Sequence, residues 1–138
     1  MDIREQILRG TRIIAVVGLS PNPSRDSHAV AKYLQEQGYR IVPVNPNADE
    51  ILGEKSYYDL MSIPFDVDMV NVFRRSEEAG AVARDAFKIG AKSLWLQRGV
   101  ISGEASVLAG QTGIDFVMDD CAECVHKELL REGRLSPQ

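Results

Sequence analysis

The chain has 138 residues, which suits one domain over residues 1–138 with a single core and one site, and leaves no room for a separate catalytic domain. The formal charge of −4 argues against nucleic acid as a partner, because binding a phosphate backbone needs a concentrated excess of Lys and Arg. There is no apolar run of membrane-spanning length, no signal-peptide pattern and no disulfide framework, so we expect a cytoplasmic protein with no membrane partner.

The first quarter of the chain predicts a helix, a strand, a loop and a second helix. An N-terminal helix over residues 2–9, within segment 1–11, is expected to pack outside the core. The apolar run 12–17 then predicts a buried strand that breaks at Gly18 into a loop rich in Ser, Pro and Asn. Residues 28–37 have apolar positions on one helical face, and Gly38 follows where a helix commonly ends.

The middle of the chain predicts two more strands and a helix. Runs 40–44 and 69–73 are rich in Val and predict strands, whereas residues 51–64 are irregular and predict a loop with at most one short helix. Residues 76–89 repeat the helical pattern, with Ser76 as the expected N-cap and Gly90 at the end.

The last third predicts a strand at 93–96, a helix at 103–111 ended by Gly113, a strand at 115–118 and a helix at 122–131. Asp120 and Glu123 have capping-box spacing before that helix. We expect the tail, residues 132–138, to fray. Strands that alternate with helices and read as continuous apolar runs predict a doubly wound α/β domain, with a parallel five-stranded sheet and helices on both faces.

The loop after the first strand predicts a phosphate site. In an open parallel sheet, ligands bind beyond the carboxyl ends of the strands, where backbone amides and the positive end of a helix favour anions. Ser20, Ser24 and Ser27 offer hydroxyl groups there, and Arg25 offers a planar donor fork suited to phosphate. The alternative is a plain solvated loop in which Gly18 only makes a tight turn.

Two features after the third strand point to the same edge. Arg74 and Arg75 precede a helix, where the macrodipole disfavours cations, so their placement requires an anion or a carboxylate nearby. Phe73 is either a core residue or the wall of an adenine-sized pocket.

The first turn lacks the pattern of a dinucleotide site. It has one glycine followed by two prolines instead of G-x-G-x-x-G, and the second strand ends Val44-Asn45-Pro46 without a carboxylate for a ribose. These features argue against NAD and FAD, whereas NADP stays open because arginine can accept a 2′-phosphate. A phosphate-binding G-K-[ST] loop is also absent, which argues against NTP hydrolysis.

Motifs along nearly the whole chain resemble a known family. They are Ile14-Ala15-Val16-Val17-Gly18, Asn22-Pro23-Ser24-Arg25, Gly38-Tyr39-Arg40, Pro43-Val44-Asn45-Pro46, Leu52-Gly53-Glu54, Val67-Asp68, Val72-Phe73-Arg74, Ile89-Gly90-Ala91-Lys92, Trp95-Leu96-Gln97 with Gly99, and Met118-Asp119 with Cys121. The chain resembles the small stand-alone CoA-binding proteins, which are similar in fold to the CoA-binding domain of the succinyl-CoA synthetase α subunit.

This resemblance implies a Rossmann-like domain that binds coenzyme A through its 3′-phospho-ADP part and has no catalytic residues of its own. The pyrophosphate would lie at the first loop, the ribose and adenine near the second and third strand ends, and the pantetheine arm near the fourth. The expected contacts are Gly18, Leu19, Ser20, Ser24, Arg25, Ser27, Val44, Asn45, Pro46, Phe73, Arg74, Gln97 and Gly99. The alternatives are an NADP-dependent or acyl-CoA-processing enzyme, and a protein-interaction domain that has lost its ligand.

Two positions depart from the family pattern. The family usually has Pro where this chain has Asp26, and Arg where it has Asp120, so the expected anion site is more acidic here. We therefore expect this chain to bind coenzyme A more weakly than a chain with the family pattern. We also expect Asp120 to raise the pKa of the neighbouring Cys121 thiol relative to the family.

Cys121, Cys124 and His126 do not predict a metal site, because the two cysteines share a helical face that His126 lies off. A thioredoxin-type pair is disfavoured, since that motif follows an early strand. Buried, inert cysteine is the leading interpretation. The alternative left open is a mixed disulfide between Cys121 and the thiol of CoA.

Overall fold

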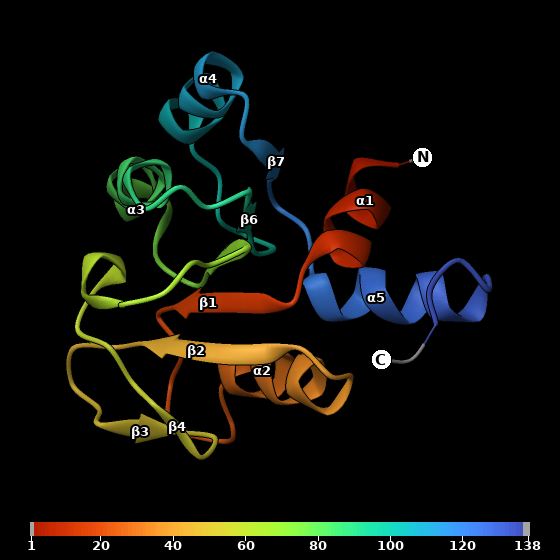
Figure 1. Cartoon of the computed structure of the whole chain (residues 1–138), viewed down its shortest axis with the longest axis horizontal. Coiled ribbons are helices and arrows are strands. Elements are labelled where there is room, and N and C mark those ends of the chain that lie inside the picture. Colours follow the sequence, from red (N-terminus) through yellow and green to blue (C-terminus); the bar gives the residue numbers. More distant parts are fainter. Residues whose placement is uncertain (1, 137–138) are drawn as a thin grey trace.

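A computed structural model describes residues 2–136 and shows, within that range, a five-stranded parallel sheet with helices on both faces (Figure 1). The strands of this sheet are β1 (Ile13–Val17), β2 (Arg40–Val44), β5 (Met69–Val72), β6 (Ser93–Leu96) and β7 (Asp115–Val117). Their spatial order is β2-β1-β5-β6-β7, and every pairing is parallel. The predicted Rossmann-like, doubly wound α/β fold is confirmed.

The helices divide into two layers, one on each face of the sheet (Figure 1). They are α1 (Ile3–Gly10), α2 (Asp26–Glu36), α3 (Ser76–Lys88), α4 (Gly103–Thr112) and α5 (Ala122–Arg131). Helices α1, α2 and α5 pack on one core, and α3 and α4 pack on the other. No helix in the described part of the chain is long and apolar enough to cross a membrane.

Helix α1 is part of the core. The sequence predicted that it packs outside the core, and that prediction is wrong. Leu8 is fully buried, and its carbonyl oxygen accepts a hydrogen bond from the Tyr39 hydroxyl at 2.8 Å. Ile7 is buried in the same cluster. The prediction failed because a helix of two turns has few residues on its apolar face, so the sequence pattern did not show that this face is buried.

The irregular segment 51–64 contains one element that the sequence did not predict. A two-stranded hairpin joins β3 (Glu50–Ile51) to β4 (Glu54–Lys55), and its turn residues Leu52 and Gly53 both have positive φ. Strands of two residues are too short to show an alternating pattern. The sequence predicted at most one short helix in this segment, and the structure has one, the 3₁₀ helix η1 (Leu60–Ser62).

Two predicted helix caps are wrong. Ser76 is the first residue of α3 and not its cap; its hydroxyl instead accepts a hydrogen bond from the Ile101 amide at 3.0 Å. Cys121, and not Asp120, caps α5, and its sulfur accepts a hydrogen bond from the Cys124 amide at 3.2 Å. In both cases a tertiary contact fixes the polar side chain that the local spacing assigned to the helix.

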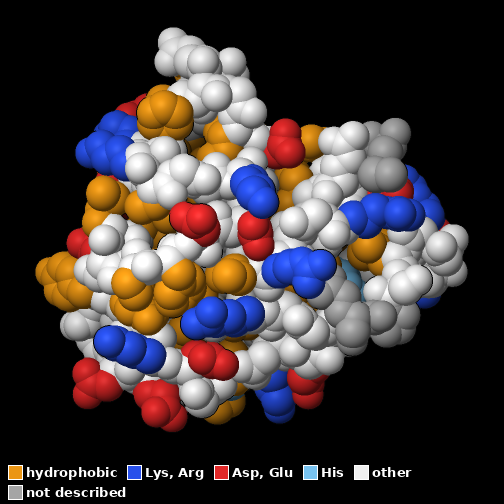
Figure 2. Space-filling model, in the orientation of Figure 1, with side chains coloured by type: hydrophobic (Ala, Val, Ile, Leu, Met, Phe, Trp, Pro, Cys, Tyr) orange, Lys and Arg blue, Asp and Glu red, His pale blue; other side chains and the backbone are white. Residues whose placement is uncertain are grey.

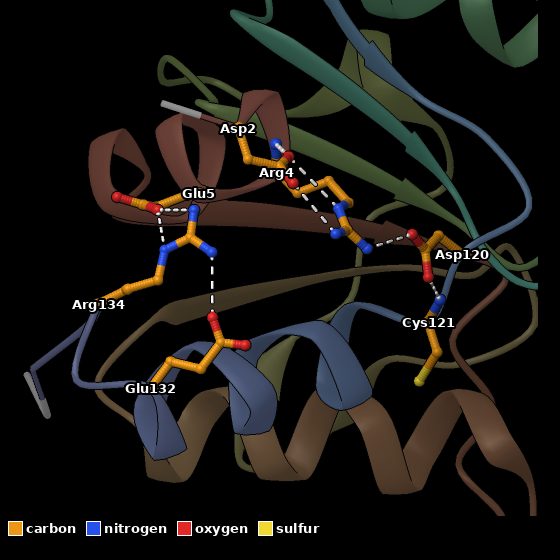
Figure 3. A network of polar contacts seen from close by, with 7 residues as sticks. All are labelled: Asp2, Arg4, Glu5, Asp120, Cys121, Glu132 and Arg134. Atoms are coloured by element: carbon orange, nitrogen blue, oxygen red, sulfur yellow. Dashed lines mark hydrogen bonds and ion pairs between the residues drawn. The ribbon is translucent and has the colours of Figure 1, made fainter.

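Residues 132–135, for which the sequence predicted fraying, carry contacts to the rest of the fold. Arg134 pairs with the buried carboxylate of Glu5 and with Glu132 (Figure 3). The Arg134 carbonyl accepts a hydrogen bond from Arg9 at 2.6 Å, and Leu135 packs against the core. Residues 137 and 138 of the predicted tail lie outside the described residues.

Candidate ligand-binding site

The carboxyl ends of β1 and β5 form the point where the strand order reverses. From β1 the chain passes through α2 to β2 on one side, and from β5 it passes through α3 to β6 on the other. In open parallel sheets such a point opens a crevice in which ligands bind. The sequence predicted its site at this edge of the sheet.

Two adjacent cavities lie at this point. The loop cavity has a volume of about 560 Å³ and is lined by Gly18, Ser20, Ser24, Arg25, Asp26, Ser27 and Phe73. The strand-end cavity has a volume of about 640 Å³ and is lined by Asp26, Ala29, Val30, Phe73, Arg74, Arg75, Gln97, Arg98, Gly99, Val100, Cys121, Glu123 and Cys124. They share Asp26 and Phe73 and so adjoin at the carboxyl edge of the sheet; we refer to the two together as the cleft.

The loop cavity uses some of its amides within the protein. The Gly18 amide donates to the carbonyl oxygen of Val44 at 3.0 Å, and the Ser20 amide donates to the Ser27 hydroxyl oxygen at 3.0 Å. These hydrogen bonds hold the loop in shape but occupy two donors that the resemblance places on a pyrophosphate. The start of α2 offers other donors, because its N-cap residue Arg25 makes no side-chain cap hydrogen bond.

Gly18 has a structural reason to be glycine. Its φ is +87°, in the left-handed region, and a Cβ at this position would overlap the carbonyl oxygen of Phe73 on the neighbouring strand end. The close approach of β1 and β5 therefore accounts for this residue without a ligand. Phe73 combines both predicted roles, since its side chain packs against the core and also lines both cavities.

The arginines at the cleft differ in how far their charges are neutralised. Arg75 pairs with Glu78 at 3.5 Å, and Arg74 lies 4.0 Å from the same carboxylate, so the expected carboxylate is present. Arg25 and Arg98 are exposed and have no ion pair within residues 2–136. On the face seen in Figure 2, basic and acidic side chains are interspersed. These two guanidinium groups have no competing carboxylate in the described residues and are available to an anion.

The predicted contacts divide into those that line the cleft and those that do not. Gly18, Ser20, Ser24, Arg25, Ser27, Phe73, Arg74, Gln97 and Gly99 line it, whereas Leu19, Val44, Asn45 and Pro46 do not. Leu19 is fully buried. Asn45 braces the loop instead: its side-chain amide donates to the Leu19 carbonyl at 2.9 Å.

The sequence placed Asp26, Arg75 and Cys121 near the site without identifying them as contacts, and all three line the cleft. It missed the other lining residues, which are Ala29, Val30, Arg98, Val100, Glu123 and Cys124. The spacing of the α2 residues was visible in the sequence as a helical face. Which face of α2 meets the cleft depends on packing across the sheet, and the sequence alone does not give that.

Asp120 is neutralised by a residue from the N-terminal helix. Its Oδ2 accepts a hydrogen bond from the Arg4 guanidinium at 3.0 Å, and its Oδ1 accepts one from the Cys121 amide at 3.0 Å (Figure 3). Burial is the main cause of the raised pKa of the Cys121 thiol, and the Cys124 side chain acts in the same direction. The Asp120 carboxylate contacts Arg4 and the Cys121 backbone, and its effect on the thiol relative to the family stays a prediction.

His126 belongs to the core and not to the cleft. Its ring is 2% exposed, Nδ1 lies 2.7 Å from the Tyr33 hydroxyl, and burial lowers the pKa of the imidazole. In the described part of the chain no group of three or more His, Cys, Asp and Glu side chains is placed to hold a metal ion.

The fold and the cleft define a Rossmann-like α/β domain with a ligand-binding crevice at its switch point. A family model described as a CoA binding domain matches residues 12–127, and the chain belongs to this family. The relatives include both a protein of similar length and a much longer enzyme subunit.

The uncharacterized protein YneT of Bacillus subtilis is 43% identical over 122 residues, which are 88% of this chain and 90% of that protein. A solved structure of a hypothetical protein from Pyrococcus horikoshii is 36% identical, with a TM-score of 0.90, and the match covers 94% of this chain and 93% of that one. The α subunit of an ADP-forming acetate–CoA ligase from Pyrococcus furiosus is 41% identical over 59 residues, 42% of this chain but only 13% of the subunit.

Proposed function

We propose that the protein binds coenzyme A or an acyl-CoA in the cleft between β1 and β5 and is not catalytic on its own. One observation carries the proposal: the uncapped start of α2 and the unpaired Arg25 both face the loop cavity at the switch point. Membership of the CoA-binding domain family supports the identity of the ligand.

The pyrophosphate would lie in the loop cavity, against the first turn of α2. Helix amides and Ser24 would donate hydrogen bonds to its oxygens. Asp26 lines the same cavity and places a carboxylate near the phosphates, so it would weaken binding relative to a chain with proline there. A neutral substitution of Asp26 is expected to tighten binding.

The 3′-phosphate would pair with Arg25 or Arg74, and the pantetheine arm would run along the strand-end cavity past Gln97 and Gly99. The lining of this cavity includes Phe73, after β5, and Cys121, at the start of α5. Gln97 is 7% exposed, so its side chain is held by the protein before a ligand arrives. These assignments place the thiol end of the ligand near α5.

Isothermal titration with CoA, dephospho-CoA, ADP and NADP tests the proposal. We expect CoA to bind most tightly, dephospho-CoA more weakly, and ADP weakest of the CoA fragments, because each lacks contacts that the longer ligand makes. Tighter binding of NADP than of CoA would favour the alternative of an NADP-dependent enzyme. Absence of binding by all four ligands would overturn the proposal.

A further inference from the structure

Two cysteines line the strand-end cavity together. Cys121 caps α5, and Cys124 is in its first turn; both residues line the cavity. The Cys124 amide donates to the Cys121 sulfur at 3.2 Å, so the two residues are already in contact. Cysteines at such a spacing at a helix start lie within reach of one disulfide bond.

The two thiols differ in access. Cys121 is 8% exposed, whereas Cys124 is an exposed residue. Burial raises the pKa of the Cys121 thiol, and the nearby Cys124 side chain acts in the same direction. Cys124 is therefore the thiol that can attack a molecule in the cavity, and Cys121 lies behind it as the thiol that can attack Cys124 in turn.

We propose that Cys121 and Cys124 form a dithiol pair that reduces a low-molecular-weight disulfide held in the cleft, with a disulfide of coenzyme A as the ligand. This inference rests on the proposed function, which places the thiol end of the ligand beside α5. It adds an activity to a domain that otherwise only holds its ligand. Gln97 belongs to the same wall, and its Oε1 accepts a hydrogen bond from the amide of Ala122, next to Cys121, at 3.5 Å.

The exchange proceeds in two steps that balance. The Cys124 thiolate attacks one sulfur of the bound disulfide, which gives a mixed disulfide on Cys124 and releases the first CoA as a thiolate that takes up a proton. The Cys121 thiolate then attacks the Cys124 sulfur, which closes the Cys121–Cys124 disulfide and releases the second CoA thiol. The ligand gains two electrons and two protons from the dithiol, and a small dithiol reductant restores the pair.

The test uses the reduced full chain, free of oxygen, mixed with CoA disulfide and followed by intact mass and by released thiol. We expect the wild type to lose two hydrogen atoms and to release two CoA thiols per chain. Cys121→Ser should keep one CoA as a reducible adduct on Cys124, and serine preserves the helix cap. Cys124→Ser should react roughly tenfold more slowly, because its remaining thiol is buried.

A comparison with hydroxyethyl disulfide separates the pair from the binding site. Arg25→Ala should slow the reaction with CoA disulfide more than the reaction with hydroxyethyl disulfide, whereas Arg131→Ala, at an exposed position outside the cleft, should change neither. Equal rates for wild type and Cys124→Ser, or a stable CoA adduct on the wild type without an internal disulfide, would overturn the inference. If CoA still binds in the presence of excess dithiothreitol, the proposed function survives that failure. If CoA does not bind, the proposed function and the CoA specificity of the pair fall together.

Discussion

The guanidinium of Arg4 and the carboxylate of Asp120 lie 3.0 Å apart and connect α1 to the turn that begins α5. Arg4 also pairs with Asp2 at 3.1 Å, so it bridges two carboxylates (Figure 3). The Asp120 carbonyl accepts a hydrogen bond from the Trp95 indole at 2.9 Å. The turn beside the cleft is thus held from α1 and from β6 together.

A double-mutant cycle measures the Arg4–Asp120 pair. Both side chains are partly exposed, so we expect Arg4→Ala and Asp120→Ala to show a coupling free energy of about 0.5–1 kcal/mol in urea unfolding. The coupling should shrink in high salt, because ions screen such a pair. Effects that add without coupling would show that the contact contributes nothing to stability.

Replacement of the cleft arginines tests where the 3′-phosphate binds. If Arg25 or Arg74 contacts it, alanine at that position should weaken CoA binding by roughly tenfold to a hundredfold, the effect of one charge-assisted hydrogen bond. The same substitution should leave dephospho-CoA binding nearly unchanged. Arg131→Ala is the matched control, because Arg131 is exposed at the end of α5 and has no ion pair in the described chain. Equal losses for both ligands would refute the assignment.

Gly18→Ala tests the close approach of β1 and β5. The substitution would place a side chain at a φ of +87° and against the Phe73 carbonyl, so we expect a loss of at least about 2 kcal/mol in the free energy of unfolding. Gly110→Ala is the control: Gly110 is in α4 with open space at its Cβ position, so alanine should stabilise by about 0.4–1 kcal/mol. Similar melting temperatures for the two variants would contradict the explanation.

Asp68→Asn should change how the free energy of unfolding depends on pH. The Asp68 side chain is only 17% exposed and accepts hydrogen bonds from the Arg12 and Ile13 amides at 3.0 and 2.9 Å. Burial acts to raise its pKa, but these hydrogen bonds and Lys92 outweigh it, so the pKa is lowered.

The sign of the effect follows from that lowered pKa. The ionised carboxylate stabilises the fold above its unfolded pKa of about 4, and this contribution is lost as the pH falls through the lower folded value. We expect Asp68→Asn to cost about 1–2 kcal/mol at pH 7 and to differ less from the wild type near pH 3. Asp66→Asn, at an exposed position nearby, is the control and should be as stable as the wild type at pH 7. A pH-independent difference for Asp68→Asn would contradict the role assigned to its charge.

The sequence predicted the sheet well because the buried strands are continuous apolar runs. Strand β2 matches its predicted bounds, and so does α5. Topology alone placed the expected site at the edge where the structure has the cleft, since parallel strands bring their carboxyl ends together. What failed depends on distant partners: Arg4 reaches Asp120 across 116 positions, and Asn45 turns toward Leu19 rather than to the cleft.

Helix α2 begins without a side chain to accept hydrogen bonds from its first amides, unlike α4, where the Ser102 hydroxyl accepts from Ala105. Amides that meet only water exchange their hydrogens with deuterium quickly. The first turn of α2 would therefore be a native reporter of occupancy, gaining protection when an anion sits on it. A single peptide followed by mass spectrometry would then record binding without any label on the ligand.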